Sequence, residues 1–179
     1  MNRYISLLRG INISGKNKIS MSELKKGFEE LDFENVKTHL NSGNIIFSSD
    51  ACDKYMLSNN IKSMIRNRFD LDIPVLTVLQ EEIKEQLSHA PDWWGDSNKE
   101  IYDNIIFLIP PLSYEMLYNE IGHPKEEYEK VYNYKDVVFW SFSRKDYQKT
   151  NWWRETAKAD VCNKITIRTA NTVRKIVCM

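Results

Sequence analysis

Apolar residues in the first half of the chain follow alternating helical and strand periods that predict the order β-α-β-β-α-β. A helix is predicted behind the S-x-x-E capping box of Ser20 and Glu23, and a second helix ends near Phe69. The strands are expected at residues 4–8, 36–40, 45–48 and 75–79. Residues 41–44, Asn-Ser-Gly-Asn, predict a hairpin turn between the middle two.

The same order begins again after a helical stretch at 81–87 and the turn-rich segment 89–100. Strands are predicted at 101–109, 129–134, 137–142 and 165–168, and helices at 113–121, 146–158 and 170–178, the last capped by Thr169. We therefore expect an α+β fold of tandem ferredoxin-like (βαββαβ) subdomains with antiparallel sheets and a C-terminal helix. The expected subdomains are 1–90 and 91–179. One continuous α+β domain is the alternative, because the halves share little side-chain identity.

Composition indicates a folded chain with no dominant charge. Hydrophobic residues make up 42% of the 179 residues, and 25 basic residues face 25 acidic ones, so no overall field attracts nucleic acid or an anionic membrane. The charges are unevenly placed: residues 80–130 hold 12 acidic and 4 basic residues, and residues 144–179 hold 9 basic and 3 acidic. Such asymmetry is typical of an interaction face or of two segments that pair with each other.

The three cysteines are widely spaced and predict neither a disulfide framework nor a zinc site. The first residues have the pattern of a strand, not of a leader, and the longest apolar run, 105–109, is too short to cross a bilayer. We expect a cytoplasmic protein without a membrane partner. The sequence names no cofactor and no oligomeric state.

A glycine-lysine loop follows the first predicted strand. Gly10, four residues, Gly15 and Lys16 approach the spacing of a phosphate loop, but Asn17 stands where the motif needs a magnesium-binding Ser or Thr. Lys16 also precedes the helix cap at Ser20, away from the helix N-terminus that would hold a phosphate. We do not expect a nucleotide hydrolase.

The loop is nonetheless a candidate binding site, because a βαββαβ unit brings it to the same end of the sheet as the first hairpin turn. Its donors suit an anion or a carbonyl-rich ligand, whereas turn-forming asparagines and solvated lysines are the ordinary alternative. The candidate ligand-binding residues are Arg9, Asn12, Lys16, Lys18, Asn41, Ser42 and Asn44.

Basic and aromatic residues between positions 144 and 154 suggest a second hypothesis, a nucleic-acid-binding module. They are Arg144, Lys145, Tyr147, Lys149, Trp152, Trp153 and Arg154. The first strands lack the aromatic RNP pattern, and one of the adjacent tryptophans is expected to pack inward.

No residue is predicted to be catalytic. His39, His89 and His123 lack metal-ligand spacing, and linear order places no base beside a nucleophile. The acidic run 126–130 is expected to be solvated.

Residues 4–47, with LLRGIN and NSGN, and residues 165–176 resemble a conserved bacterial family catalogued as domain of unknown function 1697. The resemblance extends over essentially the whole chain. It implies two ferredoxin-like subdomains and no established activity. The family's C-terminal pattern T-x-R-N-W-x-T is matched at Thr166, Arg168 and Thr172, but Thr169-Ala170 replaces Asn-Trp. A second candidate cluster comprises Arg168, Thr169, Asn171 and Thr172.

We therefore prefer a protein that binds a ligand or a partner, with a small anionic ligand as one candidate. The alternatives are an enzyme acting on a small phosphate- or carboxylate-bearing substrate and a nucleic-acid-binding module.

Overall fold

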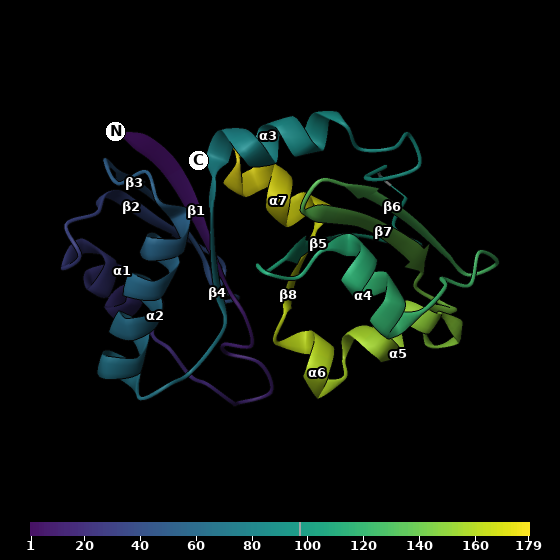
Figure 1. The fold of residues 1–179 in the computed structure, drawn as a ribbon, viewed down its shortest axis with the longest axis horizontal. Coiled ribbons are helices and arrows are strands. Elements are labelled where there is room, and N and C mark those ends of the chain that lie inside the picture. Colours follow the sequence, from purple (N-terminus) through teal and green to yellow (C-terminus); the bar gives the residue numbers. More distant parts are fainter. Residues whose placement is uncertain (97) are drawn as a thin grey trace. The chain divides into compact units, whose positions relative to one another are not determined.

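The computed structural model describes residues 1–96 and 98–179, which form two compact units. The first unit is Met1–Lys84 with Ile176–Met179, and the second is Glu85–Lys175. Each unit contains a four-stranded antiparallel sheet with interleaved helices, so the predicted α+β fold of tandem βαββαβ form is confirmed (Figure 1). The return of the last four residues to the first unit is a feature that the sequence pattern did not predict.

The first unit has the strand order β2-β3-β1-β4. Its elements are β1 (Asn2–Leu8), α1 (Met21–Glu29), β2 (Glu34–His39), β3 (Asn44–Ser49), α2 (Lys54–Phe69) and β4 (Val75–Leu79), followed by α3 (Gln80–Ser88). Strand β1 lies between β3 and β4, with Tyr4 opposite both Phe47 and Leu79.

Side-chain caps fix the starts of α1 and α2. The Ser20 hydroxyl accepts the Glu23 amide at the start of α1, and the Asp53 carboxylate accepts the amides of Tyr55 and Met56 at the start of α2, at 2.8 and 3.1 Å. Each cap satisfies a backbone donor that has no partner within its helix.

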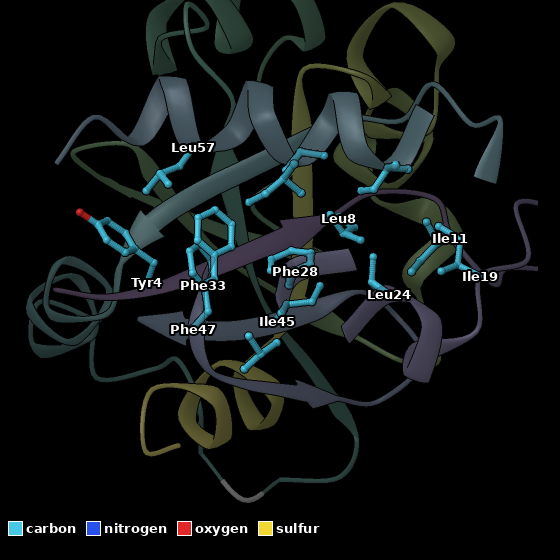
Figure 2. Close-up of a cluster of buried hydrophobic side chains, with 14 of the residues drawn as sticks. Tyr4, Leu8, Ile11, Ile19, Leu24, Phe28, Phe33, Ile45, Phe47 and Leu57 are labelled. Carbon is cyan, nitrogen blue, oxygen red and sulfur yellow. The ribbon is translucent and has the colours of Figure 1, made fainter. Parts of the chain in front are cut away.

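The core of the first unit lies between one face of its sheet and helices α1 and α2 (Figure 2). Phe28, Phe33 and Phe47 pack ring against ring, with the centroids of Phe33 and Phe47 4.4 Å apart. Ile11 and Ile19 belong to the same buried cluster. The two ends of the glycine-lysine loop are therefore anchored in the core.

The second unit has the corresponding strand order β6-β7-β5-β8. Its elements are β5 (Ile101–Leu108), α4 (Tyr114–Ile121), β6 (Glu129–Tyr134), β7 (Val137–Ser143), the 3-10 helix η1 (Tyr147–Lys149), α5 (Asn151–Thr156), α6 (Ala159–Cys162), β8 (Ile165–Thr169) and α7 (Ala170–Ile176). Its core joins Ile106, Trp140, Trp152 and Ile165.

The single helix predicted at 146–158 is wrong, because the structure has η1 and α5 there, with α6 starting after it. Thr150 and Lys158 have extended backbones, with ψ of 149° and 145°, and each stands before a new helix. The Thr150 hydroxyl accepts the Trp153 amide at 3.3 Å. A threonine placed to cap a helix thus outweighs a continuous helical pattern. The last helix also ends at Ile176, two residues before the predicted end.

The expectation of a solvated run at 126–130 is wrong for Glu129, whose side chain is buried. Its carboxylate accepts the amides of Lys125 and Asn151 and the indole N–H of Trp140. Backbone and indole donors satisfy this buried charge.

Candidate functional site

Residues 12–18 and 40–42, all of them exposed except the half-buried Asn12, form what we call the loop–turn surface of the first unit. The loop joins β1 to α1, and the turn joins β2 to β3. The two segments meet, because the side-chain amide of Asn12 donates to the Asn41 carbonyl at 3.0 Å. The backbone N–H of Leu8 also donates to the Gly43 carbonyl, at 2.8 Å. The topology therefore brings the two predicted stretches to a common end of the sheet.

A small hairpin forms within the loop. The amides of Asn12 and Lys16 donate to the carbonyls of Asn17 and Ile13, at 3.1 and 2.9 Å. Ser14 and Gly15, the central residues, have φ values of 49° and 78°. Positive φ at both positions is the requirement of a type I′ turn, which closes a two-residue hairpin without splaying its strands.

Asn12 fixes this hairpin to the rest of the unit. Its side-chain amide donates to the carbonyls of Ile19 and Asn41, both at 3.0 Å, and its side-chain oxygen accepts the Ile19 amide at 2.9 Å. Asn17 adds a bond from its side-chain amide to the Gly10 carbonyl at 2.9 Å. Both asparagines are bonded within the loop, so they organise the surface instead of offering their amides to a ligand.

The turn is equally constrained. The Asn44 side chain is fully buried and donates to the His39 carbonyl and the Ser42 hydroxyl, at 2.9 and 3.1 Å. Gly43 has a φ of 78°, and a Cβ there would lie 2.6 Å from Leu8 Cβ. Only glycine fits this backbone position.

Of the other candidates, Arg9 is half-buried and its main-chain N–H donates to the Pro74 carbonyl at 3.1 Å. Lys16 and Lys18 are exposed, and within the described part of the chain neither ammonium group has an ion-pair partner. The cationic character of the loop–turn surface therefore comes from these two lysines.

Two exposed apolar side chains also belong to this surface, and neither was predicted from the sequence. Ile13 is 59% exposed and Leu40 is 57% exposed. Leu40 also has a φ of 57°. Ile13 could have been noticed as the apolar residue within a polar loop, whereas Leu40 was assigned to the end of a strand.

The second candidate cluster lies on β8 and α7. Arg168 is buried, and its guanidinium donates to the Thr166 hydroxyl and the Ile167 carbonyl, at 2.9 and 2.8 Å. The Thr169 hydroxyl accepts the Thr172 amide at 3.3 Å, and Asn171 is exposed. These contacts give Thr169 the capping geometry predicted for it.

The aromatic and basic segment has one buried and one half-exposed tryptophan. Trp152 is buried, while Trp153 is 44% exposed and packs edge to face against Tyr147 with centroids 4.8 Å apart. Lys149 pairs with Asp146 at 2.8 Å, and this hydrogen bond raises the pKa of Lys149. The cation is thus partly neutralised within the protein.

Two further features are absent from the described residues. Positions 1–96 and 98–179 contain no group of three His, Cys, Asp or Glu side chains suited to a metal ion. Over the same residues, no helix has the length and apolar character needed to cross a membrane.

In a comparison with known protein families, residues 1–139 match the family described as protein of unknown function, DUF1697. A solved structure of a conserved bacterial protein from Streptococcus pneumoniae is similar along its length. It is 29% identical, the alignment covers 99% of this chain and 97% of that one, and the TM-score is 0.86. No match was found among curated proteins.

Proposed function

Since the chain belongs to the DUF1697 family of proteins of unknown function, we propose from its own geometry that it is a binding protein. Its contacts with a ligand or a partner are made by the loop–turn surface. The observation that carries this proposal is a pair of exposed ammonium groups, Lys16 and Lys18, which have no ion-pair partner among the described residues. They lie on a loop that is held in one shape by its own hydrogen bonds.

The hydrogen bonds matter because they hold the loop before any ligand arrives. Ile11 and Ile19 anchor its ends in the core, and Asn12 joins it to the turn. A recognition loop that is already ordered loses less conformational entropy on binding than a flexible loop. Solvated lysines are common on surfaces, but a constrained segment that carries two of them is a better receptor for negative charge.

An anionic group is the chemistry that these residues suit. Ammonium groups donate hydrogen bonds and have no acceptor, so phosphate and carboxylate groups are their natural partners. An enzyme acting on a small phosphate- or carboxylate-bearing substrate would use the same two cations for binding, and we assign no catalytic residue to it. Nucleic-acid binding is the less favoured alternative, because Lys149 already has an acidic partner and Arg144 stacks on Tyr102, 4.0 Å from the ring centroid.

A thermal-shift experiment tests the anion site. Inorganic phosphate, a nucleoside triphosphate and a dicarboxylate are each titrated into the wild type and into the Lys16→Ala/Lys18→Ala variant. We expect an anion to raise the unfolding midpoint of the wild type, and the double variant to lose most of that increase.

The matched control is Lys25→Ala/Lys62→Ala, which removes the same charge from positions paired with Glu29 and Asp72. It should respond as the wild type does. Equal responses in all three proteins would remove the proposed anion site.

A further inference from the structure

The loop–turn surface presents apolar as well as cationic side chains to solvent. Residues 13–18 are exposed without interruption, and Leu40 is exposed in the turn that Asn12 bonds to. Small ligands bind in concave sites that bury most of their surface. A run of six exposed residues projects from the unit and is suited to a larger partner.

Folding of the first unit gives little reason for a leucine at position 40. Its left-handed backbone, with φ of 57°, is one that asparagine and glycine adopt readily and leucine does not. Its exposure of 57% means that little burial offsets this strain. Single exposed leucines are ordinary, but a strained leucine on the loop–turn surface is better explained by a contact made with a partner.

Charge complementarity identifies the partner's chemistry. Lys16 and Lys18 are the cations of this surface and, among the residues described, have no acidic partner. A matching surface supplies carboxylates for the lysines and apolar side chains for Ile13 and Leu40. A basic segment would lack carboxylates for the lysines, and a purely polar segment would lack apolar side chains for Ile13 and Leu40.

We infer that the loop–turn surface binds a segment of another protein that carries acidic and apolar side chains together. This inference rests on the proposed function and specifies its occupant. Ile13 and Leu40 supply the buried contacts, and the two lysines pair with the acidic residues at the edge.

The test is a selection of displayed random peptides against the full chain, followed by affinity measurements with the enriched peptides. We expect these peptides to combine Asp or Glu with Leu, Ile or Phe. They should bind at least about tenfold more weakly to Ile13→Ser/Leu40→Asn and to Lys16→Ser/Lys18→Ser. Binding should be unchanged in Met56→Ser/Met116→Ser, which removes two exposed apolar side chains elsewhere.

The fold of the first double variant is checked by its unfolding midpoint, which should not fall, because asparagine accepts the backbone of Leu40. Peptides that need the lysines but ignore Ile13 and Leu40 would overturn this inference and leave the anion site standing. Failure to enrich peptides, or enriched peptides that ignore all four side chains, would overturn it as well. A concentration-dependent dimer abolished by Ile13→Ser/Leu40→Asn would also overturn it, because the occupant would then be a second copy of this chain.

Discussion

At the scale of single residues, the same backbone geometry serves different purposes at two asparagines. Asn12 and Asn35 have φ values of 53° and 52°. The Asn12 side chain makes three hydrogen bonds that hold the loop to the turn. At Asn35, which is exposed, it is the main-chain carbonyl that accepts the Arg3 guanidinium, at 3.0 Å. Comparing the two positions therefore separates the free-energy cost of a left-handed backbone from the stabilisation that the Asn12 side chain contributes.

We expect Asn12→Ala to lower the free energy of unfolding by about 2–4 kcal/mol, because it removes three hydrogen bonds and leaves alanine in a left-handed conformation. Asn35→Ala also leaves alanine in a left-handed conformation but removes no side-chain bond of this kind, so it should lower the free energy of unfolding by only about 1 kcal/mol. Urea denaturation of both variants measures the difference. Equal losses would mean that the Asn12 side chain does not hold the loop.

At the scale of elements, Glu129 organises the beginning of α5. Its carboxylate accepts the amides of Asn151 and Trp152, at 2.7 and 3.3 Å, while Trp140 donates from the neighbouring strand at 2.9 Å. Asn151 in turn donates its side-chain amide to the Ile121 carbonyl at the end of α4. One buried acid thus joins β6 and β7 to a helix start.

Replacing this acid with its amide tests that role. Glu129→Gln should destabilise the second unit by about 2–3 kcal/mol, because the amide nitrogen faces N–H donors and leaves one of them unsatisfied. Unfolding followed by tryptophan fluorescence reports it, since Trp140 and Trp152 are both buried beside the site. The control is the exposed Glu126→Gln, and a similar small change in both proteins would contradict the assignment.

These elements show what sequence patterns predict here and what they do not. The strand order and the meeting of residues 12 and 41 follow from apolar periods and from the topology of a βαββαβ unit. The break at Thr150, the burial of Glu129 and the exposure of Leu40 depend on donors and neighbours distant in sequence. Asn12 and Asn44 were expected to offer donors through their residue type, yet their side-chain amides bond to backbone carbonyls of the same unit, as does that of Asn17. The binding role of the candidate residues stays a prediction.

At the scale of the whole molecule, α3 carries the chain from one compact unit into the next, with the division between Lys84 and Glu85. Within the second unit, Glu85 bonds to the β6–β7 hairpin. It accepts the Tyr134 hydroxyl at 2.5 Å and the Lys135 ammonium at 3.1 Å. The hydrogen bond from Tyr134, followed by that from Lys135, holds the pKa of Glu85 below its usual value.

This lowered pKa predicts a pH dependence with a definite sign. The Glu85 contacts stabilise the fold above the carboxyl pKa of the unfolded chain, about 4.3, and the stabilisation is lost as pH falls through the lower folded value. Glu85→Gln should therefore be less stable than the wild type near about pH 7, and the gap should close towards about pH 3.

Urea denaturation across that pH range measures the gap. The exposed Glu100→Gln, whose carboxylate has no ion pair among the described residues, serves as the control and should show a smaller dependence. A gap that persists in acid would show that the carboxylate charge is not what stabilises these contacts.

The left-handed residues of the glycine-lysine loop have a kinetic consequence. Asn12, Ser14, Gly15 and Asn17 all have positive φ before any encounter, so docking requires no slow rearrangement of the backbone. Association with a complementary partner should then proceed at the speed that electrostatic steering and collision permit, and partners of different strength should differ mainly in how long they stay.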